Sequence, residues 1–343
     1  MVDLSIAIIV SFLTTYFFTP YVIRYFRLVG ITTADVHKKN KPLIPQSAGV
    51  PVAIGVMAGL LVSVFIQTFL LNNVTNFTDI FAAMTTIMII TFVGLIDDLN
   101  TKQVKLKDIT SVNYQEGKGG LSSWQKPLLT IAAVLPLVVI KAGQSTMTLP
   151  ILGSINFGIL YPLIIIPIGI VGAANMVNML GGFNGLEAGL GLIYTTFLGL
   201  FAYLHGSYIA ASLFLATAAA LLAILKYNWC PAKILPGDSI TYLLGAIVAT
   251  GAILGNMERA AIIAMVPFII QGALKLYARL KLGRFPTDLG ILQKDGTIKS
   301  RYGKSVYSWT HLIMKSGNFT EKQIVMIMMG IQLVFSLIPF ILT

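Results

Sequence analysis

Asp97 and Asp98 are adjacent carboxylates that directly follow an apolar segment ending at Ile96. Neighbouring carboxylates repel each other unless a cation or a shared proton relieves them. The C-terminal end of a helix is also an unfavourable place for negative charge, because the helix dipole is negative there. Charged groups at the edge of a membrane-spanning segment are costly and are therefore candidates for function. We interpret the pair as part of an active site.

A second polar cluster is the run from Asn175 to Glu187, which lies between two apolar segments. Asn175 and Asn178 are three residues apart and share a helical face. A Gly-Gly pair at 181–182 breaks the helix, and Gly185 allows backbone to approach a ligand closely. The run supplies three carboxamides and one carboxylate. A helix cap followed by a turn would explain one asparagine and the glycines, but not all four polar groups.

Two further candidates are Asp238 and the basic stretch Lys281–Pro286. Asp238 would serve equally as a helix N-cap, and a basic loop beside a membrane also suits anionic lipid. Hard oxygen ligands without a His or Cys cluster favour Mg²⁺ or Mn²⁺ over Zn²⁺. A divalent ion beside Lys and Arg is the usual apparatus for a diphosphate. Residue chemistry thus predicts a membrane enzyme acting on a phosphorylated substrate at the cytoplasmic face.

The elements that must position these residues are membrane-spanning helices. Of the 343 residues, 56% are hydrophobic and 11% are charged, and the mean hydropathy is +0.83. Soluble domains carry about 25% charged residues, so this composition excludes a soluble enzyme, a disordered chain and a nucleic-acid-binding domain. A spanning helix needs about 20 apolar residues. We therefore predict one all-α polytopic domain over 1–343, with ten spans at 3–23, 49–71, 79–96, 126–142, 157–175, 186–204, 207–226, 238–256, 259–278 and 322–342.

The basic residues orient this stack. Of the 24 lysines and arginines, 22 fall in one set of loops, and only Lys141 and Arg259 fall in the other. The positive-inside rule then places the active-site loops in the cytoplasm and both termini outside the cell membrane. Two sequons at Asn73 and Asn76 would face outward, where glycosylation occurs. The single cysteine, Cys230, excludes an internal disulfide.

The motifs, in this order, resemble the polyprenyl-phosphate N-acetylhexosamine-1-phosphate transferase superfamily. The resemblance runs from Ile44-Pro45-Gln46-Ser47-Ala48-Gly49-Val50 through the aspartate pair and the asparagine run to Gly237-Asp238 and Arg284-Phe285-Pro286. Bacterial members typically have two aspartates in the asparagine run, where this chain has Gly181 and Asn184. The run here, followed by Glu187, is similar to the dolichol branch of eukaryotes and archaea, and the compact chain favours an archaeal member.

The resemblance implies metal and nucleotide ligands residue by residue. Asn178 and Asp238 would ligate Mg²⁺, for which Mn²⁺ can substitute. Asn184 would hydrogen-bond the uracil of a UDP-sugar. The expected substrate-binding residues are Asn175, Asn184, Gly185, Leu186 and Glu187.

The resemblance also implies four catalytic residues: Asp97, Asp98, Lys126 and Arg284. The two aspartates would lie by the metal and the acceptor phosphate, and the pattern leaves their separate roles open. Lys126 precedes an apolar span with a Leu-Leu pair, as the phosphate-binding lysine of the family does, whereas Lys107 fits the spacing from the aspartates; we favour Lys126. Gly283 stands where the branch has His, which leaves the identity of the hexosamine open.

The expected activity is transfer of GlcNAc-1-phosphate from UDP-GlcNAc to dolichyl or polyprenyl phosphate, with release of UMP. This reaction is the first step of lipid-linked oligosaccharide assembly for N-glycosylation. Membrane lipids and a second copy of the chain are the other expected partners. One alternative is a bacterial-type undecaprenyl-phosphate hexosamine-1-phosphate transferase for cell-wall polymers. A second, from another class, is an anionic-lipid transporter, since intramembrane carboxylates also line transport paths.

Overall fold

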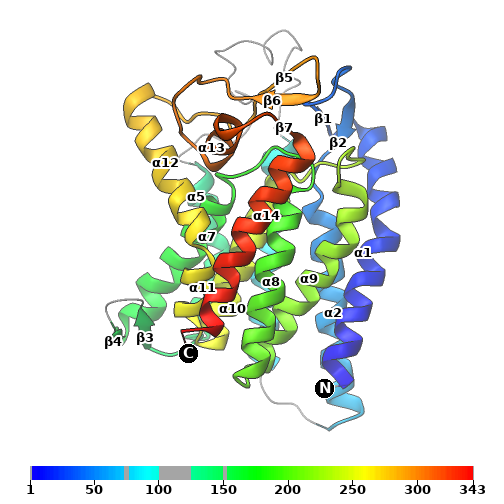
Figure 1. The fold of residues 1–343 in the computed structure, drawn as a ribbon. Coiled ribbons are helices and arrows are strands. Elements are labelled where there is room, and N and C mark those ends of the chain that lie inside the picture. The colour runs from blue at the N-terminus through cyan, green and yellow to red at the C-terminus, as the bar shows by residue number, and fades with distance from the viewer. Residues whose placement is uncertain (1, 73–76, 100–124, 150–152, 343) are drawn as a thin grey trace.

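The computed structural model describes residues 2–72, 77–99, 125–149 and 153–342. The two sequons at Asn73 and Asn76 lie outside the described residues, as does Lys107. Long helices run side by side in one bundle (Figure 1). The two ends of the chain lie at the same end of this bundle, and β1, β2, β5, β6 and β7 lie at the other.

Seven helices within the described residues are long and apolar enough to cross a membrane on their own. Helices of this kind satisfy every backbone hydrogen bond internally, which lipid requires. They are α1 (Val2–Val29), α2 (Gly49–Phe69), α3 (Phe77–Leu99), α8 (Leu186–Leu204), α9 (Tyr208–Asn228), α10 (Gly237–Gly255) and α14 (Glu321–Leu337), the last continued by the 3₁₀ turn η3 (Ile338–Phe340).

The other three predicted spans are helical but interrupted. An eighth span exists if α11 (Glu258–Ala264) and α12 (Val266–Leu282) are counted as one, although the two helices are bent by 60° relative to each other. Proline, which cannot donate a backbone hydrogen bond, occurs near the start of α5, α6, η2, α7 and α12. The structure therefore confirms a multi-pass helical protein. Seven or eight of its described spans are long and apolar enough to cross a membrane, and two of the ten predicted spans are shorter apolar helices, Gln125–Val139 and Tyr161–Val177. These interrupted segments are α5 (Gln125–Thr130), η1 (Ile131–Val134), α6 (Leu135–Val139), η2 (Tyr161–Ile165), α7 (Ile166–Val177), α11 (Glu258–Ala264) and α12 (Val266–Leu282).

Three small antiparallel sheets join the helices, and the all-α prediction did not include them. Each strand is two to four residues long, too short for an alternating apolar pattern to mark it in the sequence. The long loop before the last helix contains one of these sheets and the helix α13 (Trp309–Ser316). The strands are β1 (Thr32–Ala34), β2 (Leu43–Pro45), β3 (Thr146–Leu149), β4 (Gly153–Asn156), β5 (Ile291–Leu292), β6 (Thr297–Lys299) and β7 (Phe319–Thr320).

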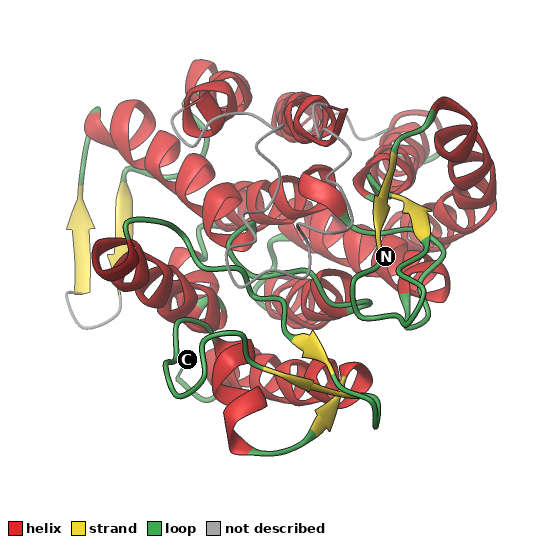
Figure 2. Cartoon of the chain, turned by 90° about the horizontal axis from the view of Figure 1, so that it is seen from above, coloured by secondary structure: helices red, strands yellow, loops and turns green. Residues whose placement is uncertain are grey.

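Helix α10 is the centre of the bundle. It packs against α2, α3, α7, α8 and α9, and every residue from Ser239 to Ile253 is buried. Viewed from above, helices surround the middle of the molecule on all sides (Figure 2). The first turn of α10 thus places Asp238 at the middle of one end of the bundle, where the loops from the other helices meet.

Candidate active site

Asp98 holds the first turn of α10. Its carboxylate accepts hydrogen bonds from the backbone N–H groups of Asp238, at 2.7 Å, and Ser239, at 3.2 Å. The hydroxyl of Ser47 also donates to it, at 2.7 Å. A carboxylate is well placed at a helix N-terminus, because the free N–H groups and the dipole there are positive. Asp98 was expected beside the metal and the acceptor phosphate, and its contacts in the structure orient the turn that carries Asp238.

The close approach of α3 and α10 depends on Gly94. A Cβ atom at this position would lie 2.5 Å from the Cα of Ser239 and 2.7 Å from the carbonyl oxygen of Asp238. No side chain fits at that distance, so the last turn of α3 lies directly against the first turn of α10 only because residue 94 is glycine. This contact brings the carboxyl end of α3 to Asp238.

Asp97, Lys126, Asn178 and Asp238 form the second part of the site. The ammonium of Lys126 lies 2.5 Å from the Asp97 carboxylate and 2.7 Å from Oδ2 of Asp238. Asn178 Nδ2 donates to the same Asp238 oxygen at 3.2 Å. Four residues from α3, α5, α10 and the end of α7 therefore meet, and among the described lysines it is Lys126 that contacts the aspartates.

The donor set of this cluster fits a hard divalent cation. The two carboxylates converge on one positive charge, which here is the ammonium of Lys126. Asn178 Oδ1 accepts from the Thr241 hydroxyl at 2.8 Å. Because a hydroxyl both donates and accepts, Thr241 is equally compatible with the reverse amide orientation, in which the oxygen faces Asp238. Within the described ranges, no group of three or more His, Cys, Asp or Glu is arranged to hold a metal ion, so phosphate oxygens or water would have to complete the coordination, as is usual for Mg²⁺.

Three residues of the asparagine run have structural contacts. Asn175 donates to the carbonyl of Val171 in its own helix, at 2.8 Å, and this bond does not join it to the aspartate cluster. Leu186 is fully buried at the start of α8. Glu187 accepts from the backbone N–H of Gly182 at 2.7 Å. Of these three expected substrate-binding residues, Glu187 thus helps to hold the loop after α7 in shape.

Asn184 and Gly185 lie deeper in the same loop. Asn184 is 2% exposed, and its Nδ2 donates to the Asp35 carboxylate at 2.8 Å. Because a carboxylate only accepts hydrogen bonds, Asp35 fixes the orientation of this amide. Gly185 has φ of +88° and donates to Asn228, and a Cβ there would lie 2.7 Å from the Trp229 ring. Asn228 and Trp229, at the end of α9, therefore shape the loop that carries Asn184.

A buried group around Glu321 was not foreseen. The Glu321 carboxylate accepts from the backbone N–H of Asn184 at 2.9 Å, and it lies 3.7 Å from His37 and in a short ion pair with Lys38. Burial opposes the charge on Lys38, but Glu321 and Asp35 raise the pKa of its ammonium above the usual value. These contacts tie the β1–β2 loop and the start of α14 to the asparagine run. The only sequence signal was a Lys three residues after an Asp.

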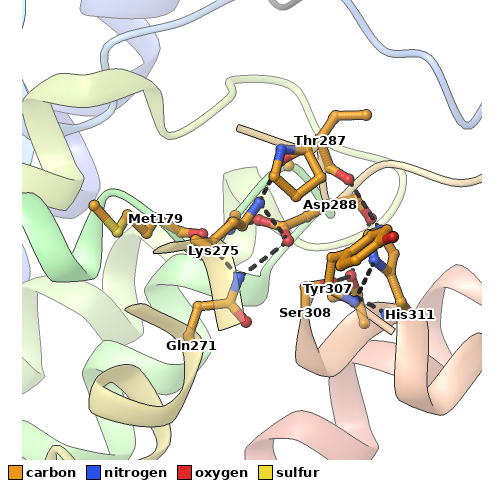
Figure 3. Close-up of polar contacts among 12 residues, drawn as sticks. Met179, Gln271, Lys275, Thr287, Asp288, Tyr307, Ser308 and His311 are labelled. Carbon is orange, nitrogen blue, oxygen red and sulfur yellow. Dashed lines mark hydrogen bonds and ion pairs between the residues drawn. The ribbon is translucent and has the colours of Figure 1, made fainter. Parts of the chain in front are cut away.

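A second unforeseen group surrounds Asp288 (Figure 3). Asp288 pairs with Lys275 at 2.8 Å, and nearby His311 accepts from the Tyr307 backbone and contacts the Thr287 carbonyl at 2.9 Å. Burial lowers the pKa of the His311 imidazole to about 4, so the ring is neutral at physiological pH. Arg284 is half-buried at the start of this segment, and no hydrogen bond or ion pair within the described residues joins it to the aspartate cluster.

Comparison with known proteins places this arrangement in a family. Residues 80–256, which include most of α3, Lys126, Asn178 and Asp238, match the family model described as Glycosyl transferase family 4. A protein of Saccharolobus solfataricus is 34% identical over 98% of this chain and 95% of its own length. A protein of Sulfolobus acidocaldarius is 30% identical over 99% of this chain and 96% of its own length. Both names describe a UDP-N-acetylglucosamine–dolichyl-phosphate N-acetylglucosaminephosphotransferase.

A bacterial relative shows how far the likeness extends. The phospho-N-acetylmuramoyl-pentapeptide-transferase of Clostridium perfringens is 28% identical over 79% of this chain and 82% of its own length. The matched family model covers more than half of the chain, and the two archaeal relatives cover almost all of it. The chain belongs to glycosyl transferase family 4.

Proposed function

We propose that this protein transfers GlcNAc-1-phosphate from UDP-GlcNAc to dolichyl or another polyprenyl phosphate and releases UMP. The observation that carries the proposal is the meeting of Asp97, Lys126, Asn178 and Asp238 at one end of a membrane bundle. The two archaeal relatives, similar over nearly the whole chain, carry names that state this activity. The family thus supplies the reaction class and the cluster supplies the groups to perform it.

An apolar groove beside the cluster supports a lipid acceptor. It has a volume of about 520 Å³ and is lined by residues of α5, η1 and α7: Pro127, Leu128, Ile131, Pro167, Ile168, Val171 and Gly172. Pro127 directly follows Lys126, so the groove begins one residue along the chain from the lysine of the cluster. A polyprenol chain lying in this groove would bring its phosphate to Lys126. Holding both reactants in this way lowers the entropic part of the barrier.

The chemistry then needs one displacement. An oxygen of the lipid phosphate forms a bond to the β-phosphorus of UDP-GlcNAc, and the bond from that phosphorus to the bridging oxygen breaks, so that this oxygen leaves with UMP. A phosphate monoester is ionised near pH 7, since its second pKa is about 6, and no strong base is required. Lys126 would bind phosphate oxygens while Asp97 and Asp98 hold Lys126 and Asp238 in place. Mg²⁺, held by Asp238 and Asn178, would neutralise the charge on the diphosphate.

A product assay tests the proposal. The purified protein is incubated with tritiated UDP-GlcNAc, a polyprenyl phosphate and Mg²⁺, and the organic phase is analysed for lipid-linked sugar. We expect a lipid product that disappears with EDTA and returns in part with Mn²⁺. A panel of UDP-sugars identifies the hexosamine. Absence of any lipid-linked product would favour the alternative of an anionic-lipid transporter.

Cysteine labelling tests the proposed orientation, in which the site faces the cytoplasm and both termini lie outside. Ser145 is exposed before β3 at one end of the bundle, and Lys304 is exposed between β6 and α13 at the other. In a Cys230→Ser background, Ser145→Cys should react with an impermeant maleimide in intact cells, and Lys304→Cys should react only after lysis. Labelling of residue 304 in intact cells would contradict the orientation.

Nucleotide choice is tested at Asn184. Asn184→Asp places a carboxylate against that of Asp35, where the structure has an amide at 2.8 Å. We expect the KM for UDP-GlcNAc to rise at least about tenfold, because the amide donor is lost and two carboxylates repel. The double variant Asn184→Asp/Asp35→Asn restores one amide and one carboxylate. It should recover thermal stability but not KM if the amide reads uracil; an unchanged KM in the single variant would place uracil recognition elsewhere.

A further inference from the structure

The Asp288 cluster, defined here as Gln271, Lys275 and Asp288, joins three segments that are distant in the chain. Oδ1 of Asp288 pairs with Lys275 Nζ at 2.8 Å and accepts from Gln271 Nε2 at 3.0 Å; both partners lie on α12. Its other oxygen accepts from the backbone N–H of Gly181, in the asparagine run, at 3.4 Å. All three side chains are almost completely buried. Figure 3 shows Lys275 and Gln271 reaching Asp288 from the same side.

Gln271 and Lys275 extend these connections through backbone atoms. Gln271 Nε2 also donates to the carbonyl of Met179, at 2.9 Å, and its Oε1 accepts from the backbone N–H of Trp309, at 3.1 Å. Lys275 Nζ donates to the carbonyl of Pro286 at 2.6 Å. The cluster therefore bonds to the asparagine run, to the segment after α12 and to the start of α13. The asparagine run and the segment after α12 have no regular secondary structure at these contacts, and α13 begins at its contact.

The bonded positions adjoin residues of the candidate site. Met179 follows Asn178 directly, and Gly181 lies three residues before Asn184. Pro286 lies two residues after Arg284, so the same ammonium fixes the backbone of the segment that carries that arginine. A shift of the cluster would thus move the asparagine run and the Arg284 segment relative to each other.

Stability alone is a poor reason for such a cluster. Burying an ion pair costs desolvation that roughly cancels its attraction, and apolar replacements are often as stable. What a hydrogen-bonded ion pair adds is direction, because each donor and acceptor must lie at a defined place. We propose that Gln271, Lys275 and Asp288 are positioning residues, which hold the asparagine run against the Arg284 segment in the arrangement that binds the UDP-sugar. This inference rests on the proposed function.

A double variant separates positioning from stability. Asp288→Asn and Lys275→Met each leave one buried charge without its partner, and we expect both to lower the melting temperature. The double variant Asp288→Asn/Lys275→Met contains neither charge and should recover most of that melting temperature. Its KM for UDP-GlcNAc should nevertheless stay raised at least about fivefold, a loss of about 1 kcal/mol, while its KM for polyprenyl phosphate changes less than about twofold. Recovery of the KM for UDP-GlcNAc together with stability would overturn the proposal.

The matched control is Tyr161→Phe, which removes a buried hydrogen bond to Glu258 at the other end of the bundle. It should lower the melting temperature with both KM values unchanged. If it raised the KM for UDP-GlcNAc as the cluster variants do, general loosening would explain the effect and positioning would be overturned.

Hydrogen–deuterium exchange gives a readout that does not depend on turnover. In the full-length protein, the double variant should exchange faster than wild type over residues 179–187, and Tyr161→Phe should not. If wild type forms no lipid-linked product, the proposed function fails, and exchange still reports on the cluster. Unchanged exchange over residues 179–187 in the double variant would overturn the positioning role whatever the reaction is.

Discussion

Asp238→Asn should lower turnover at least about a hundredfold, a loss of about 2.7 kcal/mol in transition-state stabilisation. Oδ2 of Asp238 accepts from both Lys126, at 2.7 Å, and Asn178, at 3.2 Å. An amide at this position removes the negative charge from the place where Lys126 and a divalent ion would be held. The backbone contacts to Asp98 involve the N–H of residue 238 and are kept, so the fold should be preserved. Initial rates of lipid-product formation, with melting temperatures, measure both effects.

The control for this variant is Asp295→Asn, which removes the same charge from the exposed turn between β5 and β6. It should keep nearly the wild-type rate. An Asp238→Asn enzyme retaining more than about a tenth of the wild-type rate, a loss below about 1.4 kcal/mol, would reduce Asp238 to a structural partner of Lys126 and Asn178.

Lys126→Met is the second change with a large expected effect. It removes the ammonium that lies 2.5 Å from Asp97 and 2.7 Å from Asp238, and it leaves two carboxylates facing each other. We expect kcat/KM for polyprenyl phosphate to fall at least about a hundredfold, because the ammonium beside the groove is lost. Lys126→Arg should retain part of the wild-type kcat/KM, since arginine keeps the positive charge but presents it with a different geometry.

Two other lysines provide controls for Lys126. Lys141→Met, at the other end of the bundle, should leave kcat/KM unchanged. Lys107→Met should also have little effect if Lys126, which contacts both aspartates, is the phosphate-binding lysine. A large loss in Lys107→Met, with Lys126→Met near wild type, would reverse this assignment.

The bundle was predictable because membrane-spanning helices can be recognised from the length and apolar composition of a segment alone. The number of uninterrupted spans was not, because apolar content does not show where a helix bends. Proline positions were the available signal: Pro127, Pro136, Pro162 and Pro167 all fall within segments that the structure divides. The short strands, with two to four residues each, leave no detectable pattern.

The aspartate cluster was predictable only in part. The family motif brought Asp97, Lys126, Asn178 and Asp238 together correctly, but it did not separate the roles of the two aspartates. Asp98 acts on the first turn of α10, which lies 140 residues further along the chain. A helix cap so distant in sequence has none of the local spacing by which caps are recognised.

The Asp288 cluster shows why other contacts were missed. Asp288 and Gly181 are 107 residues apart, and Asn184 and Asp35 are 149 apart. Such pairs depend on how the loops fold over the end of the bundle, and the fold of these loops cannot be inferred from local patterns in a single sequence. An acidic residue two positions after the basic stretch 281–286 was the visible signal, since an isolated carboxylate near Lys and Arg has a partner available to it.

The fate of the β-phosphate of UDP-GlcNAc tests the central claim most directly. The enzyme is incubated with polyprenyl phosphate and UDP-GlcNAc carrying ³²P only in the β-phosphate, and the aqueous and organic phases are separated. A phosphotransferase moves the label into the lipid phase and leaves unlabelled UMP in water, and added UMP then returns the label to UDP-GlcNAc. Labelled UDP in the aqueous phase would mean that the bond between sugar and phosphate is cleaved, and it would contradict the account.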